Sequence, residues 1–294
     1  MAGTEYASPL LQFVPHDHSG PTVIALARLQ LTMDAFEVRE FEKDADDVDA
    51  HRRLWAMKRD AVPEVRERYM RTIEAARAQG ANIVVFGEMT YPALGRLEED
   101  EPFEKQLQEC ADAYGMHVVA GSSHQVQAPP AQRYNMSRIF VPQADKPFEQ
   151  KKHISAHRTG EIVDIPPVPR VTVLGMAGCN YGVIICADAT DGNLSRQIGK
   201  QNGDDGQCYR PIHVLMCPSF SYSSAMFDRA HVFANQAQAH VAIVNGLDDP
   251  GVGICALYRP GLGAPPLDPF HEDDELSVYH VKDFSLPVRR VAAV

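Results

Sequence analysis

The chain has 294 residues, of which 45% are hydrophobic and 23% charged, an ordinary composition for a globular protein with a substantial buried core. Its formal net charge of −11 argues against a surface for nucleic acids or anionic membranes. No apolar run approaches the length of a membrane-spanning helix, and the first residues lack the basic start and apolar core of a signal peptide. We therefore expect a cytoplasmic protein that binds neither nucleic acid nor membrane.

The six cysteines favour reduced thiols over a disulfide framework, because most of them lie in apolar, strand-like surroundings. None forms a Cys-x-x-Cys pair, and none has the spacing of zinc ligands. No phosphate-binding glycine loop follows a predicted strand. The sequence thus predicts no metal site and no cofactor.

The N-terminal part of the chain combines a tail, a strand and a charged segment. Residues 1–21 are expected to form an extended N-terminal tail, because prolines and glycine interrupt any periodicity. The apolar run 22–32 predicts the first strand. Residues 37–59 are charged and rich in helix-forming residues, which predicts an acidic, solvated and partly helical insertion at about 35–60. With this insertion, residues 22–294 are expected to form a single domain.

Helical and strand-like patterns then alternate along the chain. Apolar residues three and four positions apart predict helices over 63–79 and 102–114, each followed by a glycine that suits a helix end. Two further helices are predicted over 192–201 and 224–239. Predicted strands cover 82–88, 117–122, 135–141, 171–174, 181–186, 212–217, 241–245, 253–258 and 276–281. This alternation predicts an α/β fold.

Three of these strands lead to a residue with reactive chemistry. The apolar run 182–185 ends at Cys186, the run 83–86 is followed by Glu88, and the basic pair Lys151 and Lys152 follows the strand 135–141. Open α/β sheets usually build their sites at the carboxyl ends of strands. Taken alone, Cys186 fits a buried core cysteine better than a reactive one. The two other strand ends change that interpretation.

Glu88, a lysine and Cys186, in this order, resemble the catalytic triad of the nitrilase superfamily of carbon–nitrogen hydrolases. The resemblance covers about 22–261 and extends to several flanking motifs, among them Tyr134-Asn135, Cys217-Pro218-Ser219 and Asn245-Gly246. It implies a four-layer α-β-β-α sandwich of the nitrilase type. It also implies assembly as a homodimer or a larger homo-oligomer.

The resemblance assigns the catalytic lysine to Lys151, because the family carries it two residues before a histidine, here His153. Lys152 is then expected on the opposite face of the strand. A shift of the register by one residue exchanges the two lysines. Lys152 therefore stays open as the alternative.

The resemblance also implies a role for each residue of the triad. Cys186 is the nucleophile, Glu88 the general base, and Lys151 the positive charge that activates the thiol and stabilises the oxyanion. The backbone N–H of Ala187 is a candidate second oxyanion donor. Glu161 corresponds to a second glutamate that the family often places near the lysine and the substrate, although a loop glutamate is more often simply solvated.

Tyr91 and Ser219 are further candidate auxiliary or substrate-binding residues, because they lie in loops expected around the site. Three departures from the family pattern indicate a divergent member. Asp191-Gly192 stands where Pro-Glu is common, Cys217 replaces the asparagine of Asn-Pro-Ser, and Cys255 replaces a serine in a later strand.

The implied function is cysteine-dependent hydrolysis of a non-peptide C–N bond through a thioester acyl-enzyme. A small carboxamide or N-carbamoyl compound is the expected substrate, in preference to a nitrile. Two alternatives stay open. One is acyl transfer to an amine, which shares the thioester. The other is a non-catalytic oligomerisation or interaction module, which is conceivable as part of a larger protein.

Overall fold

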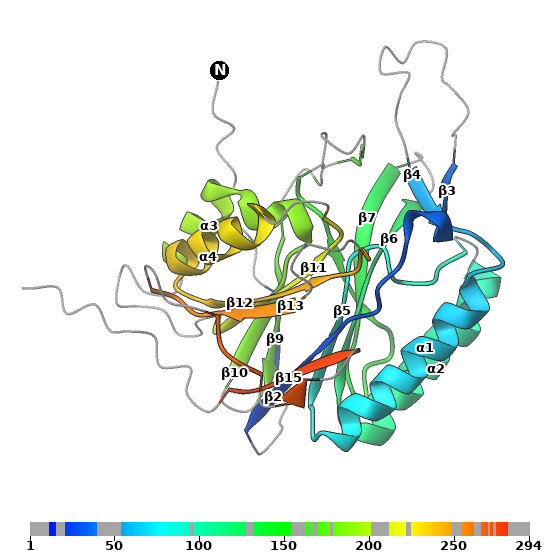
Figure 1. Ribbon diagram of the computed structural model, residues 1–294, viewed down its shortest axis with the longest axis horizontal. Helices are drawn as coiled ribbons and strands as arrows, with labels where there is room; N and C mark the ends of the chain where they lie inside the picture. The colour runs from blue at the N-terminus through cyan, green and yellow to red at the C-terminus, as the bar shows by residue number, and fades with distance from the viewer. Residues whose placement is uncertain are drawn as a thin grey trace, which may run out of the picture.

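Two β-sheets face each other, and helices cover the outer side of each sheet (Figure 1). The computed structural model describes residues 12–15, 21–39, 54–94, 97–127, 132–154, 161, 163–164, 166, 170–176, 179–200, 212–221, 225–248, 255–261, 266–269, 271–272 and 275–281. None of the helices in these residues is long and apolar enough to cross a membrane.

The six-stranded sheet holds three parallel strands at its centre: β10, β11 and β12. Its order is β1 (Gln12–Pro15), β9 (Thr172–Met176), β10 (Cys179–Val183), β11 (Val214–Ser219), β12 (His240–Asn245) and β13 (Cys255–Tyr258). The strand β1 lies within the predicted N-terminal tail and pairs in parallel with β9, so the described part of that tail is an edge strand.

The seven-stranded sheet also has a parallel centre, formed by β2, β5 and β6. Its order is β14 (His271–Glu272), β15 (Leu276–Val281), β2 (Thr22–Ala27), β5 (Ile83–Phe86), β6 (His117–Gln127), β7 (Gln132–Phe140) and β8 (Phe148–Lys151). Parallel strands end at the same edge of a sheet, so the loops after β5 and β6 can build one site.

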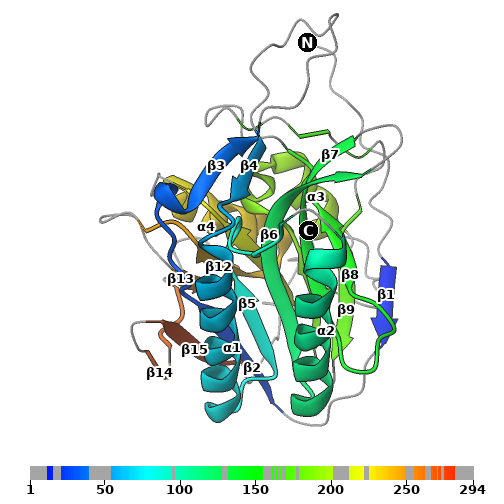
Figure 2. The same ribbon diagram turned by 90° about the vertical axis from the view of Figure 1, so that its right-hand side faces the viewer.

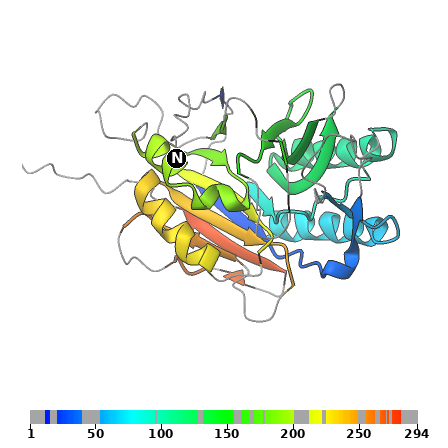
Figure 3. The ribbon, with the colours of Figure 1, turned by 90° about the horizontal axis from the view of Figure 1, so that it is seen from above.

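Helices α1 (Val62–Ala78) and α2 (Leu97–Tyr114) cover the seven-stranded sheet. Helices α3 (Gly192–Gly199) and α4 (Ala225–Ala237) cover the six-stranded sheet, and Figure 3 shows the two helix pairs on opposite outer sides. Two short 3₁₀ helices, η1 (Met33–Ala35) and η3 (Cys186–Thr190), precede β3 and α3.

Successive side chains of the central strands point to opposite faces of each sheet, so the buried residues form three separate hydrophobic cores. On β5, Val84 and Phe86 pack toward α1 and α2, whereas Ile83 and Val85 pack between the sheets. On β11, Leu215 and Cys217 pack toward α3 and α4, whereas Val214 and Met216 pack between the sheets. Helix, sheet, sheet and helix therefore follow one another, which confirms the predicted α/β sandwich of four layers.

The predicted helical insertion is wrong for the residues that the structure describes. They form an antiparallel hairpin of β3 (Phe36–Arg39) and β4 (Leu54–Met57), while residues 40–53 lie outside the described part of the chain. Phe36, Leu54 and Met57 are buried, so this hairpin covers part of the core rather than projecting as a solvated charged segment.

Glycines let the two sheets approach each other closely at the edge where the parallel strands end. A Cβ atom on Gly87, just after β5, would lie 2.6 Å from the Cα of Gly246, just after β12. A Cβ atom on Gly121 of β6 would lie 2.1 Å from the carbonyl oxygen of Gly87. Both distances are far below van der Waals contact, so this edge tolerates no side chain at these positions.

Candidate active site

Glu88 lies where the two sheets meet. It is two residues beyond the end of β5, and its backbone N–H donates to the carbonyl oxygen of Ser219 at the end of β11, at 3.1 Å. The next residue, Met89, has a φ of 62°, which turns the chain sharply after the strand. The Glu88 side chain is almost wholly buried, with 3% of its surface exposed. Sequence and sheet geometry thus place a carboxylate inside the protein at a strand end.

Lys152, not Lys151, is the lysine that the structure places beside Glu88. Its Nζ donates to Glu88 Oε1 at 2.6 Å and to Glu161 Oε2 at 2.7 Å, and its side chain is 1% exposed. Lys151 instead lies over the ring of Tyr134, with Nζ 3.6 Å from the ring centroid. The structure therefore brings Lys152 into contact with Glu88, where the sequence assignment expected Lys151.

The register of β8 explains this difference. Lys151 pairs with Met136 of β7, and the backbone N–H of Lys152 donates to the carbonyl oxygen of Asn135. Successive residues of an extended chain point to opposite faces, so this register turns Lys152 inward and Lys151 outward. His153, on which the sequence assignment rested, contacts the carbonyl oxygen of Arg170 through Nε2 at 2.9 Å.

Glu161 joins the same cluster as a second buried carboxylate. Besides accepting from Lys152, its Oε1 accepts from Asn135 Nδ2 at 2.8 Å and contacts His124 Nε2 at 2.9 Å. Asn135 Nδ2 also donates to Glu88 Oε1 at 2.7 Å. One amide and one ammonium group therefore hold both carboxylates together.

Cys186 lies in a sharp turn after β10 and opens the 3₁₀ helix η3. Its φ of 44° is in the left-handed region, a conformation that costs a non-glycine residue about 1–3 kcal/mol. Ser219 Oγ donates to Cys186 Sγ at 3.6 Å. The charges of Glu88 and Lys152 both act on the pKa of this thiol, Glu88 raising it and Lys152 lowering it. The turn thus holds the thiol near Glu88 and Lys152.

Asp188 fixes the cysteine turn to the lysine segment. Its Oδ1 accepts from the backbone N–H groups of His153 and Ile154, both at 2.9 Å, and its Oδ2 accepts from Ile185 N–H at 3.0 Å. The side chain is fully buried. The Asp188 carboxylate therefore fixes both the residues directly after Lys152 and the residue directly before Cys186.

The cluster separates the proton affinities of its two glutamates. Burial raises the pKa of Glu88, and the attraction of Lys152 offsets only part of this effect. Burial acts in the same direction on Glu161, but Lys152 and His124 outweigh it and lower the pKa of Glu161 overall. Two carboxylates with pKa values pushed apart take different roles: Glu161 stays ionised and Glu88 can exchange a proton.

The charges of the lysine and the thiol follow from the same surroundings. Burial alone would lower the pKa of Lys152, but the carboxylates of Glu88 and Glu161 raise it well above its usual value. Burial and the negative charge of Glu88 raise the pKa of Cys186 to about 12. At neutral pH the resting site thus holds an ammonium group and a protonated thiol, so the thiol needs a base when it reacts.

Comparison with known proteins identifies the family. A family model described as carbon-nitrogen hydrolase matches residues 56–237, which is more than half of the chain. The chain belongs to the carbon–nitrogen hydrolase family. It is thus a member of a family of enzymes that act on C–N bonds. A comparison with curated protein sequences found no match.

Solved structures share the fold of this hydrolase at low sequence identity. An amidase from Nesterenkonia sp. is 14% identical, with a TM-score of 0.61 over 93% of this chain and 95% of the amidase. A CN-hydrolase superfamily protein from Xanthomonas campestris is 13% identical, with a TM-score of 0.61 over 91% and 93% of the two chains. Nit3 of Saccharomyces cerevisiae, from branch 10 of the nitrilase superfamily, is 15% identical, with a TM-score of 0.56 over 82% and 83%.

The auxiliary residues predicted for this hydrolase fall into two groups. The structure brings Glu161 and Ser219 to the cluster, and Ala187, in the first turn of η3, follows Cys186 directly. Tyr91 lies elsewhere, against α2: its hydroxyl donates to Glu104 at 3.4 Å and its ring packs near Phe103. Its side chain thus contacts α2 and Arg138 of β7.

Sequence reasoning missed three residues that shape the site of this hydrolase: Asn135, Asp188 and His124. Asn135 was visible only as part of the Tyr134-Asn135 motif, and Asp188 only as the polar residue after the cysteine strand. Their roles depend on contacts with residues 26 to 47 positions away in the chain. Only the buried position of polar residues inside apolar strands could have signalled them.

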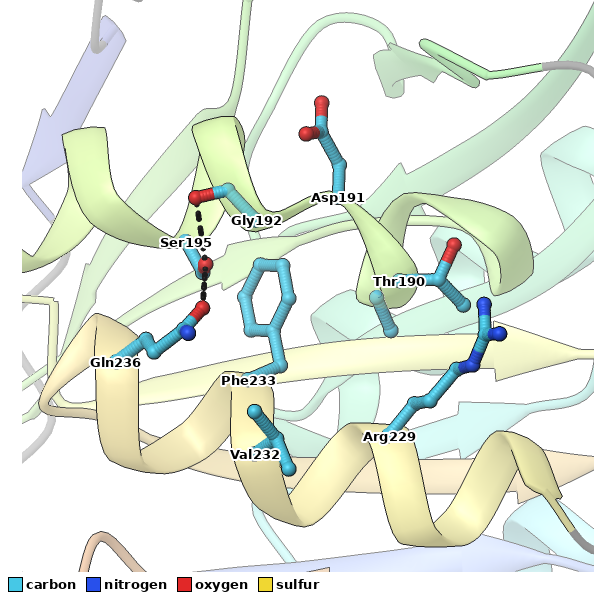
Figure 4. Close-up of a pocket in the computed structure, with 9 residues that line it drawn as sticks. Thr190, Asp191, Gly192, Ser195, Arg229, Val232, Phe233 and Gln236 are labelled. Atoms are coloured by element: carbon cyan, nitrogen blue, oxygen red, sulfur yellow. Dashed lines mark hydrogen bonds between the residues drawn. The ribbon is translucent and has the colours of Figure 1, made fainter.

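A cavity of about 230 Å³ lies on the outer side of the cysteine turn, between η3, α3 and α4 (Figure 4). Phe233 and Thr190 help to line it, Ser195 Oγ donates to Gln236 Oε1 at 2.6 Å at one end, and Arg229 lies at the other. Neither glutamate of the cluster, nor Lys152 or Cys186, is among its lining residues. This cavity is therefore separate from the candidate active site.

Proposed function

We propose that this hydrolase cleaves the C–N bond of small carboxamides through a thioester on Cys186. The observation that carries the proposal is the buried cluster in which Lys152 bonds to both Glu88 and Glu161 and the charges of Glu88 and Lys152 act on the buried Cys186 thiol. Burying two carboxylates and an ammonium group costs desolvation energy, which favours a functional over a purely structural reason for the cluster.

In the first step, the sulfur of Cys186 attacks the carbonyl carbon while Glu88 takes the thiol proton. The negative charge that develops on the carbonyl oxygen is stabilised by Lys152 Nζ and by the backbone N–H of Ala187. The C–N bond then breaks, and Glu88 returns its proton to the leaving amine. A thioester on Cys186 remains.

In the second step, water attacks the thioester carbonyl while Glu88 takes a proton from the water. The carboxylic acid leaves, and the proton on Glu88 restores the Cys186 thiol. The raised pKa of Glu88 suits these transfers, because a base with a pKa nearer to neutrality takes and returns a proton more readily. Glu161 stays ionised and keeps the ammonium group of Lys152 in place.

Known chemistry of similar structures supports the choice of carboxamides. One structure of the Nesterenkonia amidase, 14% identical to this chain, shows the acetamide moiety of fluoroacetamide added covalently at its active-site cysteine. Another structure of that amidase, 15% identical, contains butyramide. N-carbamoyl compounds and acyl transfer to amines use the same acyl-enzyme chemistry and remain outcomes of the test below.

The proposal predicts ammonia release from small carboxamides by the wild-type chain. Acetamide, propionamide and butyramide form the panel, with N-carbamoyl amines in parallel, and ammonia is quantified enzymatically. Cys186→Ala is expected to abolish turnover, a loss on the order of 10⁴-fold or more, because no other group can form the thioester. Cys255→Ala, which changes a cysteine away from the cluster, is expected to retain activity.

Turnover that survives Cys186→Ala would contradict the proposal. Absence of turnover on the whole panel, together with an unreactive Cys186, would favour the non-catalytic interaction module. The expected homo-oligomer, the single domain and the cytoplasmic location stay predictions, which sedimentation, limited proteolysis and cell fractionation can address.

A further inference from the structure

The β3–β4 hairpin reaches the candidate active site from both of its strands. Figure 2 shows the hairpin beside the end of β6, the strand that carries His124. Phe36 begins β3, and Trp55 lies in β4. Trp55 contacts His124, which bonds to Glu161, the second partner of Lys152. Phe36 contacts Phe220, which follows Ser219, a hydrogen-bond donor to Cys186. The hairpin is therefore joined to the cluster in two places.

The first connection runs through His124. The backbone N–H of Trp55 donates to His124 Nδ1 at 2.8 Å, and His124 Nε2 lies 2.9 Å from Glu161 Oε1. Because Nδ1 accepts a hydrogen bond from a backbone N–H, it carries no proton, and the ring proton is on Nε2. His124 therefore donates to Glu161 as a neutral imidazole. Its side chain is 3% exposed, so water does not compete for this bond.

The second carboxylate of the cluster is oriented by this donor. Groups on three elements face Glu161: His124 on β6, Asn135 on β7 and Lys152 just after β8. Glu88, the other carboxylate, shares Lys152 and Asn135 with it. Since His124 and Asn135 both bond to Oε1, the Oε2 atom is directed to Lys152. Through His124, the hairpin thus helps to orient the Glu161 carboxylate so that its second oxygen faces Lys152.

The second connection runs through Phe220. The rings of Phe36 and Phe220 meet edge to face, with centroids 5.4 Å apart. Phe220 directly follows Ser219, whose Oγ donates to Cys186 Sγ at 3.6 Å. The strand β3 therefore packs against the residue next to the one that donates to the sulfur.

We infer that the β3–β4 hairpin is a positioning element of the active site, and that His124 is the positioning residue through which it orients Glu161 and Lys152. The inference rests on the proposed function of the Glu88–Lys152–Cys186 cluster. His124 touches no reacting atom. It acts because a lysine displaced by about 1 Å can cost on the order of 10²-fold in rate.

Two conservative substitutions separate the two bonds of His124. His124→Gln keeps a donor at the position of Nε2 and so preserves the bond to Glu161. His124→Asn keeps an acceptor for the Trp55 N–H but is too short to reach Glu161. The measurement is the rate of Cys186 alkylation by iodoacetamide across the pH range, read by peptide mass spectrometry, with Cys255 as the internal reference.

His124→Asn is expected to slow Cys186 alkylation at neutral pH by roughly 10-fold to 100-fold, because Lys152 loses its fixed partner. It is also expected to shift the acid limb of the pH profile to higher pH, because the Glu88–Glu161 pair loses a bond that favours its ionised form. His124→Gln is expected to stay within about threefold of the wild type, because the donor remains.

His117→Gln is the matched control. His117 is also buried and bonds to Tyr181 at 2.6 Å, so its substitution is expected to lower the thermal midpoint without moving the acid limb. Wild-type-like profiles for His124→Asn would overturn the inference. If wild-type Cys186 itself reacts no faster than Cys255, the proposed function fails instead, so the two failures are distinguishable.

Discussion

Lys152→Met is expected to lower kcat for carboxamide hydrolysis by about 10³-fold or more, whereas Lys151→Met is expected to change it by about twofold or less. The large loss follows from the position of Lys152 Nζ, 2.6 Å from Glu88 and 2.7 Å from Glu161. Its removal takes away the fixed charge that stabilises the oxyanion. Lys151→Met removes a charge that lies over the ring of Tyr134. Steady-state kinetics on the carboxamide that is turned over fastest measures both effects.

Loss of folding is the competing explanation for an inactive Lys152→Met. The substitution leaves Glu88 and Glu161 buried without their cation, which destabilises a protein by about 3–5 kcal/mol. Lys152→Arg controls for this effect, because it keeps the charge but cannot place a single ammonium group between the two carboxylates. A folded, inactive Lys152→Arg supports the assignment. Loss of activity in Lys151→Met with retention in Lys152→Met would instead restore the sequence-based prediction.

Glu88→Gln is expected to lower kcat/KM by about 10²–10⁴-fold and to remove the acid limb of its pH dependence. Glu88 must be deprotonated to accept the thiol proton, and burial raises its pKa above the usual glutamate value. Wild-type activity is therefore expected to fall, as the pH is lowered, at a pH above the ordinary range of a glutamate. Glu88→Gln has no titratable side chain at this position, so its low residual activity should be nearly independent of pH.

Glu149→Gln is the control for this prediction, because Glu149 is an exposed glutamate on β8. It should keep the wild-type acid limb. An unchanged acid limb in Glu88→Gln would show that another group sets the pH dependence, and Glu88 would then not be the general base.

The local pattern of apolar residues was sufficient to predict the helices and strands that form the layers of the fold. The apolar run 276–281 predicted β15 with its observed bounds, and the stripe over 63–79 predicted α1 to within one residue at each end. Burial on both faces gives such strands an unbroken apolar sequence, and burial of one face gives a helix its stripe. The hairpin β3–β4 was missed because each of its described strands has only four residues, and because charged residues in β3 and in the segment between the two strands made the region look like a solvated helix.

The site could be predicted only in outline. Glu88 and Cys186 were found because each follows a long apolar run, which fixes the position along the chain. The resemblance pointed to Lys151, whereas the structure brings Lys152 to Glu88, because the choice depends on the pairing of Lys151 with Met136 across two strands. His124 and Asp188 act on residues 34 to 37 positions away, and no local pattern encodes such contacts.

The most direct test of the account is hydroxylamine trapping of the acyl-enzyme. A thioester on Cys186 transfers its acyl group to hydroxylamine, so a turned-over carboxamide is expected to yield the corresponding hydroxamate, detected by mass spectrometry. Hydroxamate is expected from the wild type and from Lys151→Met, and none is expected from Cys186→Ala or Lys152→Met. Ammonia release without hydroxamate, or hydroxamate formed by Cys186→Ala, would contradict a thioester on Cys186.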